Sequence, residues 1–466
     1  MNEGQGEGSP AVPRSADGPY DPFATGVAHR APTMYGAPIT YGTPPGYTGA
    51  GHSTPPPYWP GQPSTAWGPP PPPPRRGTAL LVAVVGVCVL AALAAALVGV
   101  SRSHSASASG RNGDDASLAS ARRTILAELP RLQAFVAKDR GLSWKKSVDP
   151  QVLDDADFVA ELGGGSRSSS TSGDPDDIGT TFAAMGLVKD AATFYHDANS
   201  ATDSGVVGFY DDESERLVVR GTAWTPSMEY TLVHELTHAI QDQNFDLGKL
   251  DASVRTDDET VVTDKALIEG DAERVADDYY DQQSSSWQDA VDSEEGSAPQ
   301  SATPIVDIYG AIPYVFGEDF VMGLYDKGGN AAVDTAFRAP PTTSQQLLHP
   351  EQWLAGSLPA PVPPTRPATP RGDLADVGSL GEVGLGAAVD VDDPHVSETT
   401  SLDGWMGDTY VSSDGSSGAC FVDVVHFHSA SERSTAVTFL RRWTDARHVA
   451  LQEEGAADLR LSACKK

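Results

Sequence analysis

The chain begins with a long stretch in which hydrophobic positions are almost absent. Residues 1–78 are rich in Pro, Gly and Tyr and include an unbroken proline run at 69–74. Such a segment cannot bury enough apolar surface to fold, so it predicts a disordered tail. Residues 79–100, from Ala79 to Val100, are then apolar and uncharged over the length that crosses a bilayer as one helix. The pattern therefore predicts a tail followed by a transmembrane helix.

The flanks of this apolar stretch predict its orientation. Arg75 and Arg76 adjoin its amino end, whereas the linker at 101–115 is nearly neutral. The positive-inside rule then predicts a cytoplasmic N-terminus and an extracytoplasmic domain at 116–466, in a single-pass protein of the cell membrane. A proline-rich cytoplasmic tail is also a candidate to bind a partner that recognises the polyproline conformation.

Beyond the linker, hydrophobic positions recur at helical spacing in some segments and alternate in others, which predicts an α+β domain. A proline-rich connector at 357–374 is a candidate boundary within it, and residues 284–304 have the composition of a low-complexity insertion. Helices are predicted near 118–142, 152–162, 177–195, 230–247, 259–282 and 432–443, a β-hairpin from the runs at 206–210 and 216–220, and a strand near 420–428.

Composition narrows the classes of partner and the redox chemistry. The 466 residues carry a net charge of −32, which argues against nucleic acid as a partner. Most of these charges are typical of a solvated surface. Cys88 falls in the apolar stretch, so Cys420 and Cys464 are the pair that remains, either as a disulfide or as two free thiols.

Residues 230–247 read YTLVHELTHAIQDQNFDL and contain an H-E-x-x-H motif. On a helix, His234 and His238 lie one turn apart on the same face, where both can bind one metal ion. Glu235 lies about 100° around the helix, which suits a general base beside the metal. The alternative interpretation is an ordinary amphipathic helix with two incidental histidines, and a third ligand is needed to decide.

The third ligand is predicted to come from a second helix. An extended H-E-x-x-H-x-x-G-x-x-H pattern would require glycine and histidine where the chain has Gln241 and Asn244. Glu269 instead interrupts an otherwise apolar helical face, which is costly for a carboxylate unless it is paired or bound to metal. Glu273, one turn further, is predicted to accept a hydrogen bond from a liganding histidine, or else to be a surface charge.

These residues resemble the gluzincin zinc metallopeptidases, in which an H-E-x-x-H helix is followed by a glutamate ligand on the next helix. The matching positions are His234, Glu235, His238 and Glu269, within E-G-D-A at 269–272. The resemblance implies a zincin-like fold, a Zn²⁺ cofactor and a peptide or protein substrate. It departs from the thermolysin pattern, because isoleucine precedes the glutamate ligand and a glutamate, not an aspartate, stands four residues after it.

The resemblance also suggests further parts of a substrate site. The strand at 216–221 would form the edge of the substrate cleft. A histidine or tyrosine usually steadies the oxyanion in this family, and His349 and Tyr314 are the candidates. Against these roles, a histidine before proline is often a loop residue and a tyrosine in an apolar run is often core. His426 and His428 alternate on a predicted strand and are not expected to form a second metal site.

Together these patterns predict a membrane-anchored zinc-dependent peptidase in which a zinc-activated water attacks the peptide bond, with Glu235 as general base. The alternative is a catalytically inactive zincin-fold ectodomain that acts as a binding or scaffold module at the cell surface.

Overall fold

The computed structural model describes residues 111–165, 178–221, 223–254, 258–295, 301–391, 402–416 and 418–465. The predicted tail (1–78), the predicted membrane span (79–100) and most of the linker (101–115) lie outside the described residues. The helices are α3 (Arg111–Arg140), α4 (Asp155–Gly165), α5 (Ile178–Met185), α6 (Ala191–Gly205), α7 (Pro226–Phe245), α8 (Leu247–Val254), α9 (Asp258–Tyr280), α10 (Ser285–Glu295), α11 (Pro304–Arg338), α12 (Ser344–Leu348), α13 (Pro350–Leu354), α14 (Gly381–Asp390) and α15 (Ala430–Arg447).

A small three-stranded sheet lies beside the long helices. Its order is β1 (Gln151–Leu153), β3 (Arg216–Arg220), β2 (Gly208–Asp211), with β1 parallel and β2 antiparallel to β3. The predicted hairpin is thus confirmed as β2 and β3. Leu217 and Val219 of β3 are fully buried and share one core with apolar residues of α3, α7 and α9. This core fixes α7 against the sheet.

Local chemistry sets the ends of α7. The side chain of Thr225 caps the amino end by accepting from the backbone N–H of Met228 at 3.2 Å, and Pro226 occupies the first turn, where its missing N–H is not needed. Asp246 ends the helix in the left-handed conformation. Between these caps nearly every residue from 232 to 241 is buried, which explains why so few charges fall within this stretch.

Helices α9 and α11 cross with their backbones in contact. A Cβ added to Gly270 would lie 2.0 Å from the carbonyl carbon of Gly317, and one added to Gly317 would lie 2.1 Å from the carbonyl oxygen of Ala266. Only glycine at both positions permits this approach. The crossing lies next to Glu269 and fixes that part of α9. Further along, Gly329 interrupts α11 with a left-handed φ of 60°.

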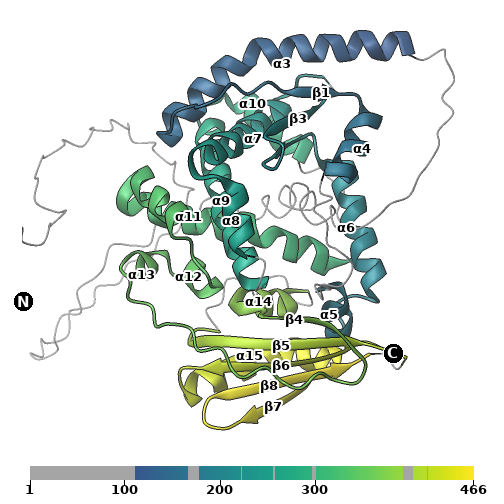
Figure 1. Cartoon of the computed structure of the whole chain (residues 1–466), viewed down its shortest axis with the longest axis vertical. Helices are drawn as coiled ribbons and strands as arrows, with labels where there is room; N and C mark the ends of the chain where they lie inside the picture. The colour runs from purple at the N-terminus through teal and green to yellow at the C-terminus, as the bar shows by residue number, and fades with distance from the viewer. Residues whose placement is uncertain are drawn as a thin grey trace, which may run out of the picture. The chain divides into compact units, whose positions relative to one another are not determined.

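A five-stranded antiparallel sheet forms the carboxy-terminal part. Its order is β4 (Asp373–Gly378), β5 (Trp405–Asp414), β6 (Cys420–Phe427), β8 (Asp458–Cys464), β7 (Ala450–Glu454). Helices α5, α14 and α15 pack on it around a second core that includes Tyr410, Phe421 and Trp443 (Figure 1). Cys420 and Cys464 are register partners across β6 and β8 and form a disulfide, which resolves the two alternatives for this pair.

The predicted architecture of a zincin-like domain behind a single transmembrane helix is wrong for the part of the chain that the structure describes. No helix there is both long and apolar enough to cross a membrane. The two longest, α3 and α11, carry charges along their length; in α11 these include Asp307, Glu318 and Asp326. The single-pass membrane location derived from that architecture is corrected with it. What the structure shows is a mixed assembly of helices and two sheets.

A second correction concerns residues 284–304, which were expected to be a low-complexity insertion. Part of this segment forms α10 (Ser285–Glu295). Trp287 explains the difference, because its ring packs edge-on against Tyr279, with centroids 5.9 Å apart, and its indole N–H lies 3.3 Å from Glu229. Together with the buried Val291 and a hydrogen bond from Tyr280 to Asp292, Trp287 attaches this polar helix to α7 and α9.

Candidate metal centre

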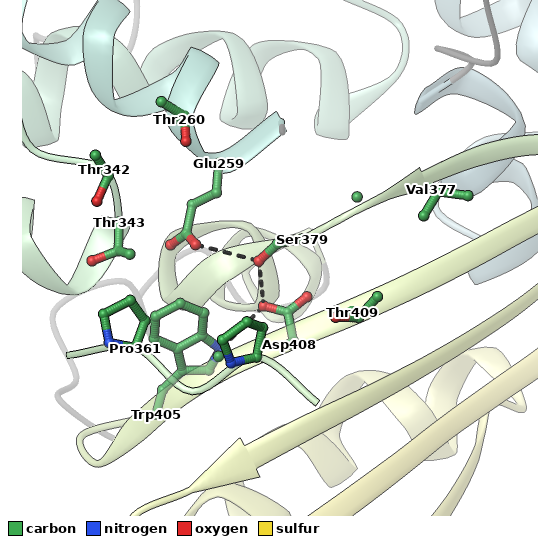
Figure 2. Close-up of a pocket in the computed structure, with 13 residues that line it drawn as sticks. Glu259, Thr260, Thr342, Thr343, Pro361, Val377, Ser379, Trp405, Asp408 and Thr409 are labelled. Carbon is green, nitrogen blue, oxygen red and sulfur yellow. Dashed lines mark hydrogen bonds between the residues drawn. The ribbon is translucent and has the colours of Figure 1, made fainter. Parts of the chain in front are cut away.

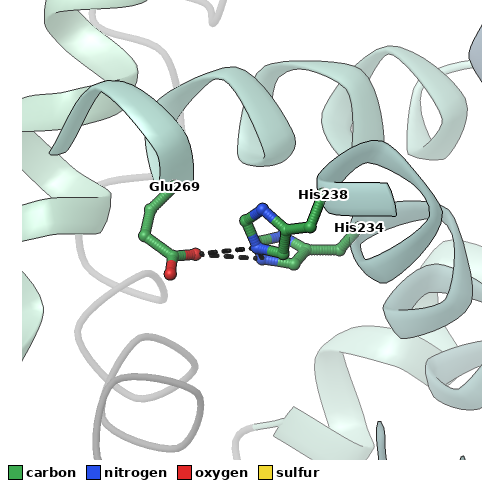
Figure 3. Close-up of side chains that lie close together, drawn as sticks. All are labelled: His234, His238 and Glu269. Atoms are coloured by element: carbon green, nitrogen blue, oxygen red, sulfur yellow. Dashed lines mark hydrogen bonds and ion pairs between the residues drawn. The ribbon is translucent and has the colours of Figure 1, made fainter. Parts of the chain in front are cut away.

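The side chains of His234, His238 and Glu269 converge between α7 and α9 (Figure 3). The Nε2 atoms of the two histidines lie 2.9 Å apart, and both face Oε2 of Glu269, at 3.1 Å from His234 and 3.2 Å from His238. Both histidines are buried, and Glu269 is largely so. The structure therefore brings together the three residues that the sequence predicted as ligands.

The donor atoms fit a metal ion. Tetrahedral zinc with bonds of 2.0–2.1 Å to nitrogen and oxygen holds its ligand atoms about 3.3 Å apart, so a small widening of the observed triangle accommodates it. Each histidine Nδ1 faces an oxygen acceptor: Glu273 Oε1 lies 3.3 Å from His234, and Gln241 Oε1 lies 3.1 Å from His238. When both Nδ1 atoms carry protons, two Nε2 lone pairs point at each other and a shared cation relieves their repulsion.

The electrostatic surroundings also favour a cation. Burial alone would lower the pKa of both histidines, but nearby carboxylates, chiefly Glu273 for His234 and Glu269 for His238, raise both pKa values above the ordinary range. Burial alone would raise the pKa of Glu269, but the two histidines hold it well below its usual range. The negative potential that would attract protons to this cluster also attracts a metal ion.

Glu235 occupies the position expected of a general base next to the cluster. It is 5 % exposed, and its Oε2 accepts from the backbone N–H of Tyr210 on β2 at 2.8 Å. Burial raises the pKa of Glu235, and the like charge of Glu269 adds to this while the histidines oppose it. The carboxylate is thus fixed by a strand and has increased proton affinity.

The strand beside Glu235 differs from the one that the resemblance suggested. Residues 216–221 were expected to form the edge of the substrate cleft, but β3 is the central strand of its sheet. β2 lies at the edge and contacts α7; a Cβ on its Gly208 would lie within ordinary contact of Thr231 and Glu235. The edge strand next to the cluster is therefore β2.

Glu273 lies where it was predicted, on the far side of His234. Its Oε2 accepts from Tyr230 at 3.0 Å, and the same hydroxyl lies 2.9 Å from Asp277. Burial, with the nearby charge of Glu273, raises the pKa of Asp277 to about 7. Burial likewise raises the pKa of Glu318, which is hydrogen-bonded to Asp277, to about 9. Glu273 thus begins a chain of buried and partly buried carboxyl groups that extends from α9 to α11.

The two oxyanion candidates are placed differently. The ring of Tyr314, which is buried, stacks near that of His234 with centroids 6.2 Å apart and an interplanar angle of 21°. His349 lies at the junction of α12 and α13, half-buried, and no contact with the metal-binding cluster is seen for it among the described residues. The structure therefore brings Tyr314, but not His349, to the cluster.

Two residues at the site were not predicted as functional. In the sequence, Gln241 served only to exclude an extended metal-ligand pattern, yet in the structure it contacts His238. Its position three residues after His238 on the same helix could have indicated this contact. Asp271 lies two residues after Glu269, and side chains at this spacing on a helix point away from each other. It reaches the site from another side, through Gln241, which donates to it at 2.9 Å.

A separate cavity of about 360 Å³, lined by both polar and apolar residues, lies near the start of α9 (Figure 2). Ser379 lies between two carboxylates there, 3.3 Å from Glu259 and 2.8 Å from Asp408. Glu259 precedes Glu269 by ten residues, roughly 15 Å along a helix. Burial raises the pKa of Asp408 to about 6. These carboxylates are hydrogen-bonded within the protein, and the cavity is distinct from the metal-binding cluster.

Comparisons with protein-family models, with curated proteins and with solved structures found no match to this chain. No solved structure therefore identifies a zincin-like fold in this chain. The chemistry of His234, His238 and Glu269 is therefore the basis for inferring what this protein does.

Proposed function

We propose that this protein is a metal-dependent hydrolase of peptide bonds, with zinc as the metal. The observation that carries the proposal is the convergence of His234 Nε2, His238 Nε2 and Glu269 Oε2 beside the buried carboxylate of Glu235. Two imidazoles and one carboxylate are a ligand set typical of catalytic zinc, which keeps a further coordination position open.

Each residue has a distinct task in this proposal. His234, His238 and Glu269 would hold the metal, which when bound supplies Lewis acidity that polarises a carbonyl and lowers the pKa of water. Glu235 accepts a proton from the attacking water and returns it to the leaving amine nitrogen. The Tyr210 N–H holds the Glu235 carboxylate in place during this exchange.

The proposal is tested by comparing the full chain with its Glu235→Gln variant. We expect both proteins to bind about one zinc ion, and only the parent to cleave members of a peptide library. Glu351→Gln is a matched control, since it makes the same change in an exposed ion pair on α13, where such pairs contribute little. Peptide cleavage by Glu235→Gln at the parent rate would refute the assigned base.

A protein that binds zinc but cleaves no peptide would instead support the alternative of a non-catalytic binding module.

A further inference from the structure

Gln241 contacts His238 on the side that faces away from the metal-binding cluster. Its Oε1 lies 3.1 Å from His238 Nδ1. Its amide nitrogen donates to the carbonyl oxygen of Ile268 at 3.1 Å and to Asp271 Oδ2 at 2.9 Å. Both of these partners are acceptors, so the NH₂ group must face them and the amide oxygen must face His238.

Asp271 is fixed in turn by an arginine from a distant part of the chain. Arg140, the last residue of α3, binds Asp271 Oδ2 through Nε at 2.6 Å, and both side chains are 0 % exposed. The same guanidinium binds Asp334 of α11 at 2.8 Å and lies against the rings of Phe245 and Phe337. Separating a buried ion pair of this kind leaves a buried charge without its partner, which is strongly destabilising.

We infer that Gln241 is a positioning residue for the proposed metal centre. It accepts the Nδ1 proton of His238, which keeps the Nε2 lone pair directed at His234 and Glu269. Asp271 and Arg140 hold the amide in the orientation that this requires. The inference rests on the proposed function, because it assigns Gln241 a role toward the metal ligand.

The two ligating histidines are consequently held by chemically different acceptors. His234 faces the carboxylate of Glu273, whereas His238 faces a neutral amide whose direction is set by a charged pair. Such partners fix the tautomer and ring orientation of a ligand, and their loss typically costs 10–100-fold in metal affinity. A buried glutamine that served packing alone would affect stability without affecting metal affinity.

The test compares Co²⁺ and Zn²⁺ binding by the full chain, by Gln241→Met and by Thr237→Val. Methionine keeps the length of the side chain but removes the acceptor. Thr237 is the matched control, because it is equally buried on α7 and, within the described part of the chain, its hydroxyl binds only the carbonyl oxygen of Val233. Affinity is measured by titration, the Co²⁺ absorption spectrum reports ligand geometry, and urea denaturation of the metal-free proteins reports stability.

We expect Gln241→Met to bind both ions 10–100-fold more weakly than the parent and to change the Co²⁺ spectrum, while Thr237→Val keeps the parent values. Parent affinity in Gln241→Met would overturn the inference. Absence of metal binding in the parent would overturn both this inference and the proposed function. Metal binding without peptide cleavage would refute the proposed function but not the role of Gln241, since the affinity comparison does not depend on turnover.

A second measurement covers the case in which Gln241→Met does not fold. Nitrogen NMR of the metal-free parent, recorded at a pH high enough to make the His238 ring neutral, distinguishes its two imidazole tautomers. A proton on Nδ1 is expected, and a neutral ring protonated on Nε2 would overturn the inference.

Discussion

Replacing Gly270 with alanine tests how strongly the crossing of α9 and α11 fixes the metal-binding cluster. The new Cβ would lie 2.0 Å from the carbonyl carbon of Gly317, whereas ordinary contacts begin at 3.4 Å. The obstacle is backbone, so no side-chain rotation relieves it, and the helices must separate by more than 1 Å. Glu269 is the adjacent residue and moves with α9.

Two opposing effects determine how much Gly270→Ala changes the free energy of unfolding. Alanine in a helix interior is favoured over glycine by about 1 kcal/mol, while overpacking of this kind costs about 1–3 kcal/mol and occasionally more. Because the added Cβ would meet backbone atoms, we expect the cost of overpacking to exceed the top of that range. The net loss in the free energy of unfolding is then about 2–3 kcal/mol. For a folded part of this size, that lowers the melting temperature by roughly 3–5 °C.

The matched control is Gly386→Ala on α14, where an added Cβ would meet nothing within 4 Å. This variant should be stabilised by about 0.5–1 kcal/mol, since only the helix preference acts. The assay is urea denaturation of both variants with and without zinc, together with a metal titration. If Gly270→Ala matches the parent in both stability and zinc affinity, the claim that backbone contact fixes Glu269 is refuted.

Three further changes test other parts of the structure. Glu269→Gln should abolish stoichiometric zinc binding, measured by metal analysis after dialysis; full zinc retention would remove it as a ligand. Replacing Cys420 and Cys464 together with serine should lower the free energy of unfolding by about 4 kcal/mol from loop closure over 44 residues, measured with urea under oxidising conditions; an unchanged midpoint would contradict this. Burial, aided by the charges of Asp403 and Glu259, raises the pKa of Glu382 from 4.5 to about 8. The folded state therefore binds this proton more tightly, so its contribution is fully present below pH 4.5 and is lost as the pH rises through 8. Glu382→Gln should thus gain a few kcal/mol over the parent between pH 6 and pH 9, and parallel pH profiles would exclude the effect.

The cluster could be predicted from sequence because its ligands obey local rules. His234 and His238 are related by helix geometry alone, and Glu269 is detectable as an acid on an apolar face. The hairpin was detectable for a similar reason, since its β-branched runs lie on either side of a short polar turn. Where functional residues follow the periodicity of the helix or strand that carries them, the sequence pattern is sufficient to predict them.

The supporting residues could not be predicted in this way. Arg140 and Asp271 are 131 positions apart, and nothing local to either indicates the other. The same limit applies to the five-stranded sheet, of which only the strand near 420–428 was predicted. Strand β7 has no fully buried residue and reads ALQEE, so its alternation of polar and apolar residues is weak. Such a strand is stabilised by pairing with its neighbour, here β8, and the periodicity of its own sequence does not reveal that pairing.

The position of β8 within its sheet bears on how the protein is made. This strand follows β7 in the sequence, yet it lies between β6 and β7 and is joined to β6 by the disulfide. During synthesis β8 leaves the ribosome after the other strands of its sheet, so β6 and β7 have no strand between them until it emerges. Deletion of residues 457–466 would leave His234, His238 and Glu269 in the chain but remove an inner strand, and the edges of β6 and β7 would be exposed to other chains.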